Sequence, residues 1–154
     1  MLSAIQSGDT VTLNKYMDLF PIDGTYDTDD NTIIHLAVIY NQPKVLSLLI
    51  SEILDLDAYN AYSWTALMES LFLPDLQCFQ ILINCGADIN KGEPIVLALR
   101  NNKLKAAEIL ISANCDLSML DYFNLDAFDW DLNDPRFRIL ESANIFLVRP
   151  CLDY

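Results

Sequence analysis

The sequence predicts an all-α solenoid built from repeated pairs of short helices, and three observations lead to it. The block TIIHLA at Thr32–Ala37 recurs 33 positions later as TALMES at Thr65–Ser70. An apolar segment follows each block, at residues 45–50 and 78–83, and turn-forming residues separate block from segment. A fixed period of this length is typical of repeat architectures, in which one supersecondary unit is stacked on the next.

Each unit is expected to contain two helices, because apolar residues recur at i, i+3 and i+4 in both of its segments. No unit can bury such an apolar stripe alone, so the core must lie between units. Small residues occupy equivalent points of the first helix and allow close approach: Ala4, Ala37, Ser70 and Ala98. The predicted turns between helices are Gly8-Asp9, Asn41-Gln42-Pro43, Pro74-Asp75, Asn101-Asn102 and Asp134-Pro135.

Further copies extend the pattern along the chain. A third block at residues 93–98 precedes an apolar segment at 106–111, a degenerate block occupies 126–131, and residues 2–9 hold part of one more. Gly86-Ala87-Asp88-Ile89-Asn90 closes the second complete copy. These residues resemble the ankyrin repeat family, whose pattern runs Asp-x-x-Gly-x-Thr-Pro-Leu-His-x-Ala, then a second helix, then Gly-Ala-Asp-Val-Asn.

The resemblance implies one ankyrin repeat domain over residues 1–154, an all-α solenoid of helix–turn–helix units with short β-hairpin fingers. Its five units are expected at 1–24, 25–57, 58–90, 91–118 and 119–154, with the outer two as caps. It also implies a concave protein-binding face. Because ankyrin arrays serve many unrelated partners, the resemblance is specific for fold and not for function.

The chain departs from the family pattern in two places. The interval from Thr65 to Glu93 is 28 residues, five fewer than the first interval, which predicts a truncated finger between Asn90 and Pro94. The glycine that precedes the Thr-Pro-Leu-His block is replaced by Asp30, Ser63 and Asn124. Asn and Asp tolerate left-handed backbone, so the turn is expected to survive with some loss of stability.

Composition predicts a packed, intracellular protein. With 53% hydrophobic residues, the 154-residue chain can bury a core, and no apolar run approaches the roughly 18 residues of a membrane span. The start of the chain lacks the pattern of a signal peptide. The cysteines show no Cys-x-x-Cys spacing, so packed free thiols are favoured over a disulfide for Cys78, Cys85, Cys115 and Cys151. We therefore expect a cytoplasmic location, with the nucleus also open.

The formal net charge is −13, and the two ends carry most of it. Residues 1–35 hold six acids and one base, residues 36–112 eight and five, and residues 113–154 eight and three. Such a surface repels nucleic acid and anionic lipid. It attracts a basic protein partner. A simpler alternative is that acidity keeps an apolar-rich chain soluble.

Candidate chemistry is sparse. His35, the single histidine, stands at the family's signature position, where the ring is expected to hydrogen-bond backbone between units, and one histidine excludes a multi-histidine metal site. Residues 27–31 fail as a calcium loop, since Thr32 and Val38 occupy the positions that require Gly and Glu. Capping an exposed end is the favoured role for Asp126, Asp129 and Asp131. We expect no catalytic residue, metal or cofactor.

The family register places the finger residues and the ends of the first helices on the concave face. These positions are Thr28, Asp29, Asn31, Ile39, Tyr40, Ala61, Tyr62, Trp64, Phe72, Leu73, Arg100, Asn101, Tyr122, Phe123, Leu125, Asn133 and Asp134. An apolar, aromatic group at such positions is typical of an interface core. The acidic rim is expected at Asp27, Asp29, Asp30, Asp121, Asp126 and Asp134. The alternative is inward folding, with Trp64 on the neighbouring finger and Phe123 over the cap.

The leading functional hypothesis is a non-catalytic binding module, monomeric when free, that inhibits a basic protein partner. Two versions fit: a toxin-neutralising immunity protein and an inhibitor of a transcription factor. The second class is a scaffold or substrate-recruiting adaptor, for which the apolar tail at residues 144–154 offers a docking segment. An enzyme is the least favoured class.

Overall fold

The computed structural model describes residues 1–19, 22, 24–52, 55–118, 120 and 134–142. It divides into two compact units, Met1–Pro94 and Ile95–Tyr154, and each is described by itself. The described elements are all α-helices, as the repeat pattern predicts. None of the helices in this part of the chain is long and apolar enough to cross a membrane.

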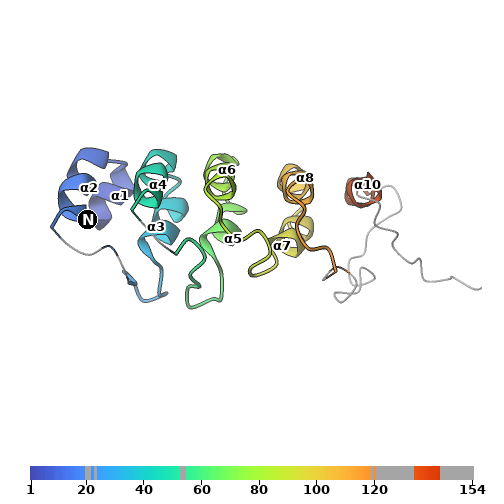
Figure 1. Cartoon of the computed structure of the whole chain (residues 1–154), viewed down its shortest axis with the longest axis horizontal. Helices are drawn as coiled ribbons and strands as arrows, with labels where there is room; N and C mark the ends of the chain where they lie inside the picture. The colour runs from blue at the N-terminus through green and yellow to red at the C-terminus, as the bar shows by residue number, and fades with distance from the viewer. Residues whose placement is uncertain (20–21, 23, 53–54, 119, 121–133, 143–154) are drawn as a thin grey trace, which may run out of the picture. The chain divides into compact units, whose positions relative to one another are not determined.

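The first unit contains three helix pairs in two layers (Figure 1). Helices α1 (Leu2–Ser7), α3 (Ile33–Ile39) and α5 (Ala66–Ser70) pack side by side in one layer. Helices α2 (Thr10–Met17), α4 (Pro43–Ile50) and α6 (Gln77–Asn84) form the other. The core therefore lies between successive pairs, as expected for a stack.

Local sequence sets where these helices begin. The side chains of Asp9, Thr32 and Thr65 accept hydrogen bonds from the backbone N–H groups of Thr12, His35 and Met68, which caps α2, α3 and α5. Helix α4 instead begins with Pro43, whose missing N–H leaves no donor to satisfy. All five predicted turns coincide with the described starts of helices or lie just before them.

Left-handed backbone appears where the family's glycine is replaced. Asp30 has φ of 55° and Ser63 has φ of 59°, so the turn before each Thr cap is kept by non-glycine residues. This confirms the prediction for these two positions. Asn124 lies outside the described residues. Gly8 and Asn41, at φ of 73° and 48°, close α1 and α3 in the same conformation.

Small side chains allow the first helices to pack closely. Ala4, Ala37, Ser70 and Ala98 are all buried, at 4%, 0%, 0% and 0% exposure, as predicted. Larger apolar side chains fill the space between the layers of the first unit, among them Leu46, Leu67 and Phe79. The core is thus continuous across the three helix pairs.

The second unit contains α7 (Pro94–Arg100), α8 (Leu104–Ser112) and α10 (Pro135–Ser142), and α10 packs against α8. The Asp134 carboxylate accepts a hydrogen bond from the Arg136 N–H at 2.9 Å and forms an ion pair with its guanidinium. That guanidinium also donates to the Leu99 carbonyl at 3.4 Å. The start of α10 is therefore tied to the end of α7.

The fingers are turns rather than strands in the described part of the chain. One antiparallel bridge, Thr25 with Thr32, closes the first finger. The connection between α6 and α7 spans residues 85–93, whereas the two earlier ones span 18–32 and 51–65. It folds on itself, with Lys91 N–H donating to the Asp88 carbonyl and Glu93 N–H to that of Asn90. The predicted shortening of this finger is confirmed.

The cysteines differ in burial. Cys78 and Cys115 are buried free thiols, and burial raises the pKa of each to about 11. Cys85 is also a free thiol but is exposed, so its predicted packing is wrong. The reason is its place at the C-cap of α6, beyond the buried face that Cys78, Phe79 and Leu82 form. Cys151 lies outside the described residues.

A thiol-reactive reagent at neutral pH is expected to modify Cys85 in the native protein and to leave Cys78 and Cys115 unreacted. Attack requires an accessible thiolate, which the two buried groups lack. Mass spectrometry of peptides after a timed pulse of iodoacetamide assigns each site. Equal labelling of Cys78 and Cys85 without denaturant would contradict this burial pattern.

Candidate protein-binding surface

The first finger is organised by one carboxylate. Asp27 accepts hydrogen bonds from the backbone N–H groups of Asp29 and Asn31 at 3.1 and 3.0 Å, and from the Asn31 side-chain amide at 2.9 Å. Loss of hydration acts to raise the Asp27 pKa, but these hydrogen bonds outweigh it and hold the pKa below its usual range. The finger tip therefore has a defined shape at neutral pH.

The second finger is organised by Asn60, which is buried. Its Oδ1 accepts from the backbone N–H groups of Tyr62 and Trp64 at 3.0 and 3.1 Å. Its Nδ2 donates to Asn31 Oδ1 at 3.0 Å and to Glu69 Oε1 at 3.1 Å. Asn31 is thus buried at 4% exposure, and its predicted place on the concave face is wrong, because its side chain joins the two fingers.

Backbone and tyrosine contacts complete the link between the fingers. Ala61 N–H donates to the Asp29 carbonyl at 2.8 Å, and Tyr62 Oη donates to Asp29 Oδ1 at 3.2 Å. The charge on Asp29 and this hydrogen bond raise the Tyr62 pKa, and the charges of Asp27 and Glu69 add to the effect. The charges of three carboxylates therefore act on one exposed phenol.

His35 joins the second helix pair to the second finger. Its Nδ1 accepts from the Thr32 backbone N–H at 3.3 Å and lies 2.8 Å from Thr32 Oγ1, and its Nε2 lies 3.0 Å from the Trp64 carbonyl. Because a backbone N–H only donates and a carbonyl only accepts, the ring must carry its proton on Nε2. The predicted structural histidine is confirmed, at 1% exposure.

This geometry predicts a pH dependence of stability. Burial lowers the His35 pKa, against smaller raising effects of the Trp64 carbonyl and Asp27. The unfolded chain therefore binds a proton near pH 6.5 before the folded chain does, so the free energy of unfolding falls as pH drops below about 6.5. Urea unfolding of wild type and His35→Gln between pH 7.5 and 5.5 measures it.

The free energy of unfolding is expected to decline from pH 7.5 to 5.5 in wild type, and this decline should be largely absent in His35→Gln. Glu69 contributes a pH dependence of the opposite sign. Burial raises its pKa, so its protonation favours the folded state. Glu69→Gln serves as the control that removes this second contribution. A pH dependence unchanged by His35→Gln would contradict the assignment.

An exposed group of aromatic side chains lies beside the fingers. The rings of Trp64 and Phe72 stack with centroids 4.9 Å apart and planes 4° from parallel. Phe72 is 47% exposed, Tyr62 is 62% exposed, and Trp64 is partly exposed. We call Tyr62, Trp64 and Phe72 the aromatic patch. Ile39, the equivalent of Phe72 one unit earlier, is 42% exposed.

The other residues predicted for the binding surface are exposed, partly exposed, engaged in an ion pair or outside the described residues. Asp29, Tyr40 and Leu73 are partly exposed in the first unit, and Arg100 is exposed in the second. Tyr122 and Phe123 lie outside the described residues, as do Asp121, Asp126, Asp129, Asp131 and the tail at 144–154. Asp134, a predicted rim acid, is engaged by Arg136. What the structure brings together is therefore Asp29 with Tyr62, and Trp64 with Phe72.

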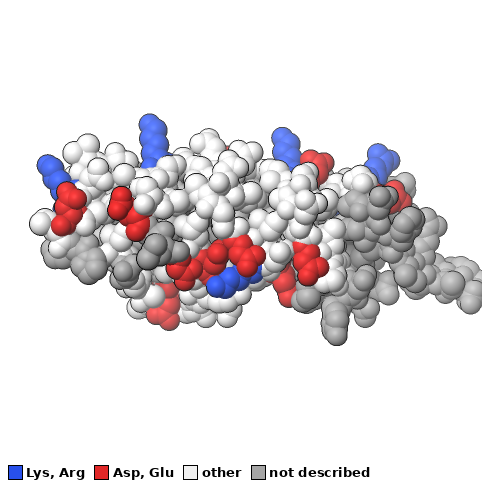
Figure 2. All heavy atoms as spheres, viewed as in Figure 1, with Lys and Arg blue, Asp and Glu red and all other residues white. Residues whose placement is uncertain are grey.

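Charge is unevenly distributed over the first unit. Between Lys15 and Lys91 the sequence holds eleven acidic residues and one base, Lys44, which is exposed on α4. Figure 2 shows acidic side chains gathered over the loops with one basic side chain among them, whereas another basic side chain stands at the edge where α4 lies. The side that carries the fingers is therefore strongly negative.

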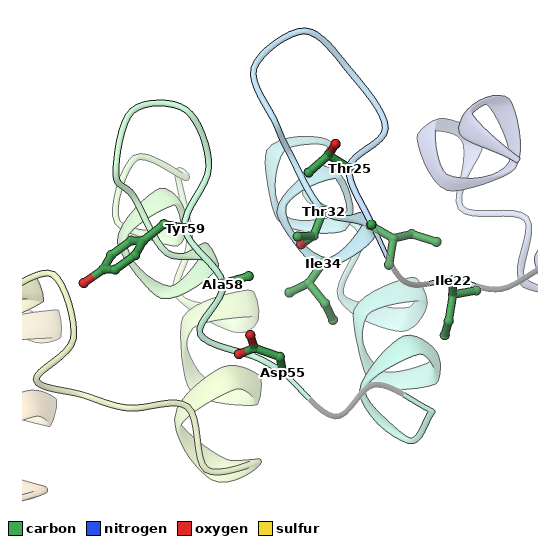
Figure 3. A pocket seen from close by; sticks show the side chains of 9 residues that line it. Ile22, Thr25, Thr32, Ile34, Asp55, Ala58 and Tyr59 are labelled. Carbon is green, nitrogen blue, oxygen red and sulfur yellow. The ribbon is translucent and has the colours of Figure 1, made fainter.

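A hollow of about 290 Å³ lies between the bases of the two fingers (Figure 3). Thr25, Thr32 and Ile34 line one side, and Asp55 and Ala58 the other. The Tyr59 ring extends away from the first group, and Lys91 Nζ lies 4.9 Å from its centroid. No group of three or more His, Cys, Asp or Glu side chains in the described ranges could hold a metal ion.

Comparison with protein-family models identifies the family of this chain. The model of the ankyrin repeats, in three copies, matches residues 1–93. The chain belongs to the ankyrin repeat family. The three copies correspond to the three helix pairs of the first unit, and an ankyrin region of this kind is a protein–protein interaction element rather than a catalytic one.

Among curated proteins, this ankyrin chain is similar to a putative E3 ubiquitin-protein ligase, XBAT31, of Arabidopsis thaliana. The two are 28% identical over 91 residues. The match covers 58% of this chain and 20% of the relative, so the chain spans a fifth of that protein's length. The description as a ubiquitin ligase therefore applies to the relative and is not extended to this chain.

Two residues that shape this surface, the buried Asn60 and the partly buried Glu69, were not predicted from the sequence. Asn60 stands 33 positions after Asp27, so the repeat register marks it as a finger-organising position. Glu69 stands 33 positions after Leu36, which is buried. An acidic residue in place of a buried leucine was a readable signal of altered surroundings.

Proposed function

We propose that this ankyrin chain is a non-catalytic module, monomeric when free, that binds a basic protein partner over its fingers and inhibits it. The observation that carries the proposal is the aromatic patch bordered by unpaired acids. Exposed aromatic side chains dominate binding hot spots, and a charged border raises association rates.

The border consists of Asp27, Asp29 and Glu69, whose charges all act on Tyr62. In the described part of the first unit, no lysine or arginine forms an ion pair with these three carboxylates. The charge they carry is therefore available to a partner. A toxin-neutralising protein or an inhibitor of a transcription factor would use such a surface to cover a cationic site.

Affinity capture from the source cells tests the proposal. The tagged chain is compared with the double variant Tyr62→Ala, Phe72→Ala at about 0.1 M and about 0.5 M salt, where screening shortens electrostatic range. We expect captured proteins rich in Lys and Arg that are lost in the variant and at high salt. The purified partner should lose activity when the chain is added.

Capture that is insensitive to both salt and the double variant would contradict the proposal. It would favour the second candidate, a substrate-recruiting adaptor, which the similarity to a putative ubiquitin ligase supports. Under that alternative, components of a ubiquitin ligase should be captured through a surface other than the aromatic patch.

A further inference from the structure

The aromatic patch has a flat outer surface. Because Trp64 and Phe72 stack almost in parallel, one face of the Phe72 ring covers the indole, and the 47% exposure of Phe72 leaves its remaining surface open. The open face of an aromatic ring attracts a cation through the ring quadrupole, so this surface can bind a cationic side chain.

A carboxylate lies beside this surface. Glu69 precedes Phe72 by three residues, and Phe72 N–H donates to the Glu69 carbonyl at 3.1 Å. Asn60 Nδ2 holds Glu69 Oε1 at 3.1 Å while Asn60 Oδ1 holds the Trp64 backbone N–H. One buried amide therefore fixes the carboxylate and the tryptophan relative to each other.

Glu69 carries an electrostatic cost that a cation would relieve. Partial burial raises its pKa, and the hydrogen bond from Asn60 offsets only part of this effect. Among the described residues, no cationic side chain pairs with it. The charges of Asp29 and Asp27 lie close enough to act on the same phenol, Tyr62, so the local potential is negative.

The short connection at residues 85–93 leaves the patch uncovered within the first unit. The second finger packs on the first through Ala61 N–H to Asp29 and through Asn60 to Asn31. The next connection reaches residues 51–65 through Asp88 N–H, which donates to Asp57 Oδ1 at 2.9 Å. Among the described residues, its backbone makes no hydrogen bond to residues 61–64. At the equivalent of His35, which bonds the following finger, stands Met68. In this repeat the finger is shorter, and a methionine stands where a histidine would bond it.

We propose that the patch, together with Glu69 and Asp29, seats an arginine side chain of an extended segment of the partner. The guanidinium stacks on the Phe72 and Trp64 rings and pairs with Glu69. Arginine fits better than lysine because its planar group both stacks on aromatic faces and binds a carboxylate through two N–H donors. This inference rests on the proposed function and specifies the chemistry of the same surface.

Two synthetic peptides test the proposal, each an acetylated dodecamer of Gly and Ser with three evenly spaced Arg or three Lys. Binding at low salt is followed through the indole N–H signal of Trp64, which Trp64→Phe assigns. We expect the Arg peptide to bind at least about fivefold more tightly. Phe72→Ala and Glu69→Gln should each weaken it about tenfold and abolish the preference for Arg.

Tyr59→Ala is the matched control, because this exposed tyrosine of the same finger is engaged by Lys91 rather than by the patch. It should leave both affinities unchanged. If Phe72→Ala does not fold, Glu69→Gln, which keeps the side-chain shape, decides alone. Equal, salt-sensitive binding of both peptides would overturn the arginine seat and leave the basic partner standing. Binding of neither peptide would overturn both.

Discussion

Replacing His35 with alanine is expected to lower the free energy of unfolding by about 3 kcal/mol. The ring is buried at 1% exposure and joins Thr32 to the Trp64 carbonyl across 29 residues of sequence. Alanine leaves that carbonyl and the Thr32 N–H without this partner, at about 1–3 kcal/mol for each buried polar group. It also opens a cavity where the imidazole stood. Urea unfolding monitored by circular dichroism at pH 7.5 measures the loss.

Thr32→Val is the matched partial variant. It removes the capping hydroxyl but keeps the bond between His35 Nε2 and Trp64, so we expect a loss of about 1 kcal/mol. The two losses should not add in the double variant, because both residues belong to one network. A His35→Ala protein as stable as Thr32→Val would mean that the link between the helix pair and the finger contributes little.

The backbone of the first unit was predictable because its determinants are local. A Thr cap, a left-handed residue before it and a small residue within the helix repeat at fixed spacing, and each has one structural meaning. Asp30 and Ser63 kept the turn without glycine, and Ala37 and Ser70 are fully buried at the predicted contacts. The 28-residue interval likewise predicted the short connection, because chain length limits its reach.

Side-chain partners were less predictable because they depend on the neighbouring unit. Asn31 was expected at the surface, but a neighbour 29 residues away draws it inward. Cys85 was expected to pack, yet it lies one position beyond the last residue of α6. The stacking of Trp64 on Phe72 depends on how a finger bends back over its own helix, which no periodicity specifies. Residues 121–133 and 143–154 lie outside the described part of the chain, so the predictions made there stay predictions.

The exposure of the aromatic patch could be predicted from the sequence, whereas the carboxylate beside it could not. The family register alone selected Tyr62, Trp64 and Phe72, because exposed finger and helix-end positions are fixed by the repeat. The register marks Glu69 as an acidic residue at the position of the buried Leu36, but it does not specify that this carboxylate lies beside the rings. The combination of aromatic rings with a fixed carboxylate follows from Asn60, whose amide reaches both.

Changing Tyr62 or Trp64 to alanine is expected to cost about 2 kcal/mol in partner affinity, roughly a 30-fold increase in Kd, with little loss of stability. Tyr62 is 62% exposed and its hydroxyl makes one surface hydrogen bond, so its removal leaves the core intact. The backbone atoms of Trp64 hold Asn60 and His35, and alanine retains them. Calorimetry with the captured partner measures affinity, and urea unfolding measures stability.

Tyr59→Ala again supplies the comparison, since it removes an exposed ring from the same finger outside the patch. It should change partner affinity by less than about 0.5 kcal/mol. If Tyr62→Ala and Trp64→Ala instead unfold the protein while affinity per folded molecule is unchanged, these rings belong to the core. The binding surface would then have to lie elsewhere. Loss of affinity in all three variants would mean that the partner contacts the whole finger rather than the patch.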